Sequence, residues 1–187
     1  MPWLQDEARQ IDYPVTGTDF YPTILDLANI DLLPGQHADG VSLKPLLENS
    51  AIEMPDRSLF WHYPHYGNQG GEPSSIIRDN DWKLIHYWED GRNELYNLES
   101  DPYEQTDLAS KKPQVAKQLA NKLDSWLTEV NAERPDKDLD YDQQKAQERR
   151  DMIVNELLPK LEQERKNILS ADFEPNDDWW GSKVTLD

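Results

Sequence analysis

The sequence predicts an α+β fold, in which a four-stranded antiparallel sheet is packed by a long helix, with N-terminal helices before it and a C-terminal helical extension after it. Between residues 58 and 98, four short runs are rich in aromatic and β-branched residues, which favour strands. Turn residues separate the last three runs, so hairpins are the simplest connections. Beyond Pro113, apolar residues recur at helical spacing. Strands and helices are therefore segregated along the chain, as in α+β folds.

The segment before the sheet is predicted to contain an extended lead-in and two short helices. Residues 1–17 show no clear period. Thr18 or Asp19 can cap a first helix, which carries one apolar face and ends near Asn29. Ser42 can cap a second, shorter helix. We expect both helices to be packing units.

Four strands are expected next, at residues 59–63, 74–78, 82–88 and 94–98. The turns at residues 79–81 and 89–92 join the second, third and fourth strands into a meander. The helix that follows, residues 115–130, has apolar residues on one face and Lys and Asp on the other. It can therefore cover one face of the sheet.

A polar and charged segment, residues 132–142, is interrupted by Pro135 and is the predicted linker. It separates a domain of residues 1–131, which includes the lead-in helices, from an extension of residues 143–187.

The extension is expected to begin with a long helix. Residues 143–169 are charged and amphipathic, with the apolar side chains on one side, and Pro159 should kink or split the helix. Trp179 and Trp180 follow near the end of the chain. Because exposed adjacent tryptophans would form an apolar patch, we expect them to dock on the body of the protein or on a partner.

The charge of the chain excludes several classes of partner. There are 19 Lys and Arg against 37 Asp and Glu, a formal net charge of -18, which argues against nucleic acid and against anionic membranes. Cysteine is absent, so a disulfide framework, a thiolate metal site and a cysteine nucleophile are excluded. Residues 1–11 lack the uninterrupted apolar stretch that a signal peptide needs. We therefore expect a chain without nucleic-acid or membrane partners.

The stretch most capable of chemistry runs from the first predicted strand into a loop, residues 60–73 (FWHYPHYGNQGGEP). It contributes imidazole, phenol and amide side chains: His62, Tyr63, His65, Tyr66, Asn68 and Gln69. Such an open, polar loop suits recognition of a hydroxylated ligand. An equally weighted alternative is that one histidine is a satisfied core residue while the glycines only allow a turn. A metal site is a weaker interpretation, because no third ligand is placed by spacing.

The remaining motifs do not complete an active site. Arg78 and Lys83 flank a tight turn and could face an anion, although such residues are more often solvated or paired with neighbouring carboxylates. The chain has no G-x-S-x-G elbow, phosphate-binding glycine loop, H-E-x-x-H or C-x-x-C. The residues alone therefore predict a binding loop on an α+β body.

Three segments and the helix after them resemble the C-terminal region of sulfatases, arylsulfatase-like enzymes of the alkaline-phosphatase-like superfamily. They are TGTDFYPTILDLANI (residues 16–30), ADGVSLKPLLEN (38–49) and the stretch at residues 57–109, which contains IRDNDWKLI and ELYNLESDP. Together they cover residues 15–130, about three fifths of the chain. The ordered combination of these motifs is specific, although each motif alone is weak.

The resemblance implies a sulfuric ester hydrolase whose C-terminal subdomain is a four-stranded antiparallel sheet packed by a helix. In that family a Cys or Ser in C/S-x-P/A-x-R becomes formylglycine, and a calcium ion helps to hold the sulfate. Neither group maps onto this chain, so no catalytic or metal-binding residue is assigned and the chain alone is expected to be inactive. Calcium and formylglycine are implied for the parent enzyme, together with a missing N-terminal domain as partner and a periplasmic or extracellular location.

The resemblance also points to a binding role for the loop after LFWHY, which approaches the rim of the pocket in similar sulfatases. It implies contacts from His62 and His65 first, then from Tyr66 and Asn68, to the sugar or other group that carries the sulfate ester. General acid catalysis by His62 or His65 is a lesser interpretation.

Two further questions stay open at the level of sequence. The chain could instead be a non-catalytic module that binds sulfated glycans or a protein, or a structural remnant with neither activity nor affinity. The extension, residues 143–187, has no counterpart in the resemblance and could be an oligomerisation helix or wrap around the missing domain.

Overall fold

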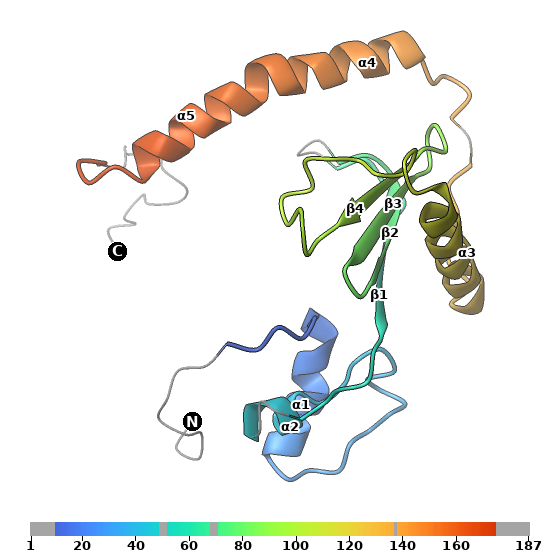
Figure 1. Ribbon diagram of the computed structural model, residues 1–187, viewed down its shortest axis with the longest axis vertical. Helices are drawn as coiled ribbons and strands as arrows, with labels where there is room; N and C mark the ends of the chain where they lie inside the picture. The colour runs from blue at the N-terminus through green and yellow to red at the C-terminus, as the bar shows by residue number, and fades with distance from the viewer. Residues whose placement is uncertain (1–9, 49–51, 68–70, 137, 175–187) are drawn as a thin grey trace, which may run out of the picture. The chain divides into compact units, whose positions relative to one another are not determined.

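The protein is described here by a computed structural model that covers residues 10–48, 52–67, 71–136 and 138–174. The chain divides into two compact units, Met1–Lys137 and Asp138–Asp187. The first unit contains the sheet and the second contains the helical extension (Figure 1). The predicted α+β class is confirmed, because the first unit is a four-stranded antiparallel sheet accompanied by helices.

The sheet is a complete meander. Its strands are β1 (Ser58–Tyr63), β2 (Ser74–Asp79), β3 (Trp82–Tyr87) and β4 (Asn93–Asn97), hydrogen bonded in the order β1-β2-β3-β4. All three adjacent pairs are antiparallel, so the meander predicted for three strands extends to β1. Asn80 turns between β2 and β3 with a φ of 51°, a left-handed conformation that asparagine tolerates better than most residues.

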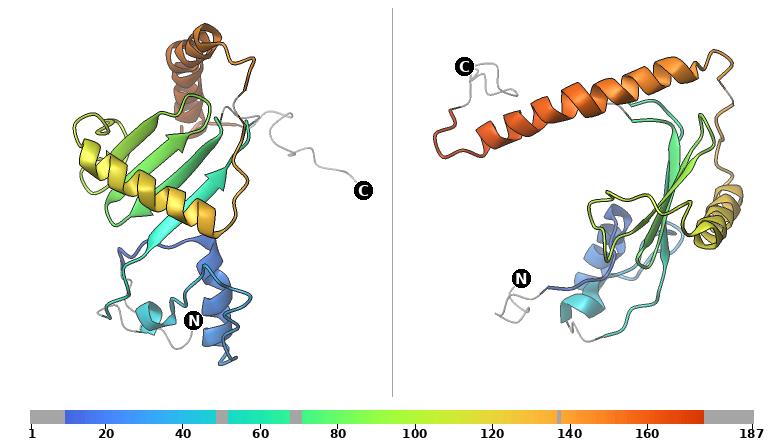
Figure 2. Two further views of the ribbon diagram at one scale, coloured as in Figure 1. Left: turned by 90° about the vertical axis from the view of Figure 1, so that its right-hand side faces the viewer. Right: turned by 45° about the horizontal axis from the view of Figure 1, so that its top comes forward.

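One row of side chains across the sheet forms the core with α3 (Pro113–Glu129). The register places Phe60 opposite Ile77, Ile77 opposite Leu84, and Leu84 opposite Leu95. Ile77, Leu84 and Leu95 are fully buried and pack with the inner face of α3. That face consists of Ala116, Leu119, Leu123 and Leu127. Figure 2 shows α3 lying across this face of the sheet. Since a fully buried Leu or Ile contributes about 1.5–3 kcal/mol, this row and the helix face are a major source of the unit's stability.

The end of α3 nearest β1 is fixed by an aromatic stack. The rings of Phe60 and Trp126 are parallel to within 5°, with centroids 4.7 Å apart. The helix starts at Pro113, where the missing N–H costs nothing, and ends before Asn131, which has a φ of 51°. The predicted helix is thus confirmed with small shifts at both ends.

The lead-in helices are tied together by a carboxylate that the sequence assigned a smaller role. A 3-10 turn, η1 (Gly17–Asp19), precedes α1 (Phe20–Leu27), and α2 (Lys44–Glu48) follows. Asp19 was expected as a possible helix cap, but its side chain makes no capping bond to α1 and is fully buried. It accepts hydrogen bonds from both terminal nitrogens of Arg57, at 2.7 and 2.5 Å, and from the backbone N–H of Val41 and Thr16. Asp19 therefore joins three segments that are distant in sequence.

The electrostatic state of Asp19 follows from these bonds. Burial by itself would raise the pKa of the carboxyl, but the hydrogen bonds from Arg57, Val41 and Thr16 lower the pKa below its ordinary value. Close backbone approach is also required here, because a Cβ at Gly40 would lie 2.2 Å from the carbonyl oxygen of Thr18. The charged form of Asp19 is the one that the fold stabilises.

The second unit is one long helical segment with an altered turn in its middle. It consists of α4 (Gln143–Met152), a π-helical turn η2 (Ile153–Leu157) and α5 (Leu158–Ile168). Asp142 caps α4 by accepting hydrogen bonds from the backbone N–H of Gln144 and Lys145. The predicted interruption at Pro159 takes the form of this π turn, because proline lacks the N–H for the preceding turn and its ring crowds the carbonyl there. The predicted tryptophan pair, Trp179 and Trp180, lies outside the described residues.

Candidate functional site

The candidate binding loop leaves β1 after Tyr63 and enters β2 at Ser74. Its two legs are joined by a hydrogen bond from the backbone N–H of Gly67 to the carbonyl of Gly71, 2.9 Å long. A Cβ at Gly67 would lie 3.2 Å from the backbone nitrogen of Gly71, a contact tighter than most Cβ contacts, so a larger residue would require a small shift of the legs. The glycines therefore do allow a tight closure, as the conservative interpretation of the sequence required.

The structure gives His62 partners inside the protein at both ring nitrogens. Nδ1 lies 2.7 Å from the Oγ of Ser75, and Nε2 lies 2.8 Å from the carbonyl oxygen of Glu133. Because a carbonyl only accepts, Nε2 carries the proton, and the Ser75 hydroxyl donates to Nδ1. The same hydroxyl oxygen accepts from the indole N–H of Trp88 at 2.8 Å. His62 is thus the middle of a hydrogen-bonded chain that ties the segment after α3 to the sheet.

His65 and Tyr66 have a different environment from His62. Side chains alternate between the two faces of a strand, so Tyr63 points to the face opposite that of His62. His65 is exposed and meets the ring of Tyr63 edge to face, with centroids 5.5 Å apart. Tyr66 is 52% exposed, and its hydroxyl donates to Oε1 of Glu89 at 2.5 Å. The fourth predicted residue, Asn68, lies outside the described residues.

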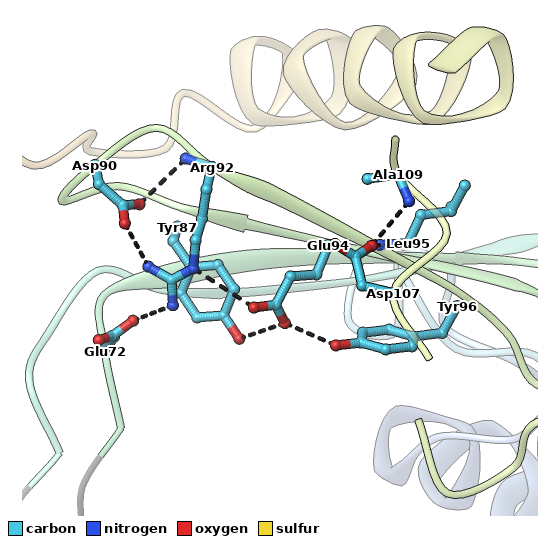
Figure 3. A network of polar contacts seen from close by, with 9 residues as sticks. All are labelled: Glu72, Tyr87, Asp90, Arg92, Glu94, Leu95, Tyr96, Asp107 and Ala109. Carbon is cyan, nitrogen blue, oxygen red and sulfur yellow. Dashed lines mark hydrogen bonds and ion pairs between the residues drawn. The ribbon is translucent and has the colours of Figure 1, made fainter. Parts of the chain in front are cut away.

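The loop is held by the turn between β3 and β4, through an arginine that sequence reasoning missed (Figure 3). Arg92 forms ion pairs with Glu72, at the end of the loop, and with Asp90 and Glu94. Its guanidinium also lies 3.6 Å from the centroid of the Tyr87 ring. Burial by itself would lower the pKa of Arg92. The hydrogen bonds and charges of Glu72 and Asp90 outweigh burial and raise the pKa above its ordinary value, so the guanidinium stays charged.

The phenols beside Arg92 complete this network. The hydroxyls of Tyr87 and Tyr96 both donate to Oε2 of Glu94, at 3.1 and 2.9 Å. Burial, followed by the charge of Glu94 and this hydrogen bond, raises the pKa of Tyr87 to about 12. The only sequence signal for the cluster was the acidic turn around Arg92, which has no distinctive spacing. With Glu89 binding Tyr66 and Arg92 binding Glu72, the turn supports both legs of the loop.

The chemistry that this arrangement offers is recognition. Exposed imidazole, phenol and ring edges can donate, accept and stack against a hydroxylated ligand. Two cations of the sheet are already engaged: Lys83, at the end of the sheet away from the loop, lies 2.7 Å from Glu104, and Arg92, beside the loop, is surrounded by carboxylates. Within the part of the chain that the structure describes, no three His, Cys, Asp or Glu side chains lie close enough to hold a metal ion. The described helices also include none that is long and apolar enough to cross a membrane.

Comparison with known proteins identifies the family. The family model for N-sulphoglucosamine sulphohydrolase, C-terminal, matches residues 2–133, well over half of the chain. The chain belongs to this sulfatase C-terminal family. The resemblance predicted from the three sequence segments is therefore confirmed, and its span agrees with the first unit of the structure.

Individual sulfatases agree with this assignment. A sulfatase from Formosa agariphila is 37% identical over 127 residues, which cover 61% of this chain and 23% of the relative. Human arylsulfatase K is 33% identical over 126 residues, covering 63% of this chain and 23% of the enzyme. The chain thus spans about a quarter of the length of these curated relatives.

Solved structures show the same domain within larger proteins. BT1596, a 2-O GAG sulfatase, matches with a TM-score of 0.56 and 26% identity over 73% of this chain and 31% of its own. BT4656, solved with its substrate D-glucosamine-2-N,6-O-disulfate, matches with a TM-score of 0.51 and 28% identity over 63% of this chain and 24% of its own. The sulfatase C-terminal domain therefore occurs beside a much larger partner domain.

Proposed function

We propose that this sulfatase C-terminal domain supplies contacts to the carbohydrate part of a sulfate ester, while the catalytic groups come from the part of the enzyme outside this chain. The observation that carries the proposal is the exposed pair His65 and Tyr66, on a loop closed by glycines and supported by the β3–β4 turn. Loops held in this way on a rigid sheet are common positions for binding residues.

The proposal assigns different tasks to the two histidines. His65 and Tyr66, with Asn68 from the same loop, would hydrogen bond and orient the sugar. His62 would act as a support, because its ring nitrogens already bond Ser75 and Glu133. General acid catalysis by His62 would require breaking the bond to Glu133, so His65 is the better candidate for any proton transfer.

The chemical step is assigned to the remainder of the sulfatase. Cysteine is absent and no serine begins the S-x-P/A-x-R pattern, so the chain has no residue that could become formylglycine. The described residues do not fit a calcium site either, since no three of their carboxylates or imidazoles are placed to hold a metal ion. We therefore expect the isolated chain to release no sulfate from an aryl sulfate.

The proposed substrate class is a sulfated saccharide of the glycosaminoglycan type. BT4656 is bound to a disulfated glucosamine, and BT1596 is a 2-O GAG sulfatase. Their sequences are 28% and 26% identical to this chain, so the likeness extends beyond the fold. The net charge of -18 does not oppose this substrate, because sulfate recognition would rest on cations in the rest of the enzyme.

A comparison of two substrates tests the proposal in the sulfatase that carries this domain. His65→Ala should raise KM for a sulfated oligosaccharide about tenfold, as expected for a lost hydrogen bond, and leave KM for a small aryl sulfate unchanged. His62→Ala should mainly lower thermal stability. Tyr103→Ala, at an exposed site outside the loop, should change neither the thermal stability nor the KM for the oligosaccharide. An unchanged oligosaccharide KM in His65→Ala and in His65→Ala/Tyr66→Phe would contradict the proposal.

The alternative of a free-standing binding module is separated by the isolated chain. If that chain binds a sulfated oligosaccharide and loses the affinity in the double variant His65→Ala/Tyr66→Phe, the loop functions without the catalytic part. Binding that needs the whole enzyme instead supports the role of a sulfatase part.

A further inference from the structure

The long helix of the second unit carries an apolar stripe that lies beyond the residues matched by the family model. The stripe consists of Ile153, Leu157, Leu161 and Ile168. Leu157, Leu161 and Ile168 are 41%, 46% and 38% exposed. An amphipathic helix with such a stripe is normally covered by a second surface.

The π turn keeps the first part of this stripe on one side of the helix. In a regular α-helix of 3.6 residues per turn, each four-residue step rotates a side chain by about 40°. Two such steps, from Ile153 to Leu157 and on to Leu161, would move the stripe well around the helix. The wider turn at Ile153–Leu157 takes up an additional residue and offsets most of this drift.

The order of residues along the stripe is nearly the same in both directions from Leu157. Ile153 and Leu161 lie four residues on either side of Leu157, and Ala146 and Ile168 lie eleven on either side. We propose that this helix, residues 143–168, pairs in antiparallel orientation with the same helix of a second copy of the chain. In that register, centred on Leu157, Ile153 of each copy meets Leu161 of the other, and Ala146 meets Ile168.

Charges beside the stripe favour the same orientation. Antiparallel pairing about Leu157 places Arg150 opposite Glu164, on each side of the two-fold axis. Parallel pairing in register would instead place each of these residues opposite its own like charge. One antiparallel pair, Arg149 with Arg165, is unfavourable, but Arg165 is neutralised by Glu162 at 2.7 Å within its own helix.

The charge distribution of the chain also favours contact at this helix. Residues 143–168 contain six Lys and Arg and five Asp and Glu, a net charge of 6 − 5 = +1, whereas the whole chain carries -18. Two copies of the chain therefore repel each other least where these helices approach. At about 1.5 Å per residue the helix is about 39 Å long, which is enough for more than three heptads of contact.

The oligomeric state of the full 187-residue chain tests the pairing. Sedimentation velocity should show a concentration-dependent dimer, and Leu157→Glu/Leu161→Glu should shift it to monomer at every concentration. Leu139→Glu, at an exposed leucine outside the helix, is the matched control and should dimerise as the unaltered chain does. Helical circular dichroism should be similar in all three, which separates lost pairing from lost folding. A monomeric unaltered chain at 100-fold the protein concentration of the first measurement would overturn the proposal.

Cross-linking tests the orientation, and the absence of native cysteine makes it specific. Ala146→Cys/Ile168→Cys should form a covalent dimer on oxidation, whereas Ala146→Cys alone should not. A covalent dimer from Ala146→Cys alone would show parallel pairing and overturn the antiparallel arrangement. If the whole sulfatase is a monomer that Leu157→Glu/Leu161→Glu destabilises, the helix packs on its own enzyme, and the pairing of two copies is wrong.

Discussion

Asp19 shows how one buried charge can organise the lead-in to the sheet. Its side chain is fully buried, and that of Arg57, 38 residues later, is 15% exposed. The guanidinium also donates to the carbonyl of Pro14 and lies over the ring of Tyr13. Removing one partner of such a pair leaves the other charge buried without compensation, which costs more than the pair itself contributes.

We predict that Asp19→Asn lowers the free energy of unfolding of the isolated chain by about 3 kcal/mol, measured by urea denaturation. The folded state holds the pKa of Asp19 below the unfolded value of about 3.9, so its contribution is present above that pH and is lost as the pH falls through the lowered pKa. Stability below pH ~4 should therefore depend less on pH in Asp19→Asn than in the unaltered chain. Asp12→Asn, at an exposed site, is the control, and equal losses in the two variants would contradict the assignment.

The roles of single residues were harder to predict than their types. The sequence identified the polar loop as unusual in composition, but gave His62 and His65 the same rank because they lie three residues apart where β1 runs into the loop. Their difference depends on Glu133, which is 71 residues from His62 and meets it only after α3 has crossed the sheet. Asp19 was likewise expected as a cap, because its partner Arg57 cannot be found from local spacing.

At the scale of elements, the β3–β4 hairpin supports the binding loop beside it. Arg92 contacts Glu72 across 20 residues of sequence, and the planar guanidinium bonds more than one carboxylate at once (Figure 3). A lysine has a single charged nitrogen and could not hold the same set of partners.

We predict that Arg92→Met and Arg92→Lys both loosen the loop, and that Arg92→Lys rescues little of the lost order. Backbone hydrogen exchange should rise in residues 63–67 and 71–73, with a stability loss of about 1 kcal/mol because the ion pairs are partly exposed. Lys122→Met, which removes an ion pair with Asp79 at the other end of the sheet, is the matched control. Unchanged exchange in the loop of Arg92→Met would refute the supporting role.

The elements themselves were largely predictable, because their signals are local. Runs rich in aromatic and β-branched residues, separated by turn residues, predicted β2, β3 and β4 to within one residue at each end, and Pro113 marked the start of α3. The π turn could not be predicted in the same way. Pro159 predicts an interruption of the helix. Whether the helix kinks, breaks or absorbs an extra residue depends on packing, which the spacing of apolar residues does not describe.

At the scale of the whole molecule, the chain spans about a quarter of the length of the sulfatases that it resembles. The sheet unit corresponds to the sulfatase C-terminal family, whereas the helix at residues 143–168 lies beyond the matched residues. The family could be predicted because several weak motifs occur in one order. The surfaces that contact partners could not be predicted, because the exposure of a side chain depends on how the helices pack in three dimensions.

The outer face of α1 carries exposed apolar side chains, and we expect it to contact the larger part of a sulfatase. Phe20 and Ile24 are one helical turn apart and are 65% and 62% exposed, and Tyr21 beside them is 41% exposed. Apolar side chains grouped in this way on a single helix usually contact another surface. Since the chain spans about a quarter of the length of its relatives, we expect the larger part of such a sulfatase to be the occupant.

We predict that Phe20→Asp/Ile24→Asp leaves the isolated chain as stable as before, within about 0.5 kcal/mol, because the side chains already face solvent. In the whole sulfatase the same substitutions would place two carboxylates in an apolar contact, and its melting temperature should fall measurably. Leu139→Asp, also exposed, should have no such effect in either form. A loss confined to the isolated chain would show that α1 packs within this unit, and an unchanged whole enzyme would show that its outer face stays in solvent.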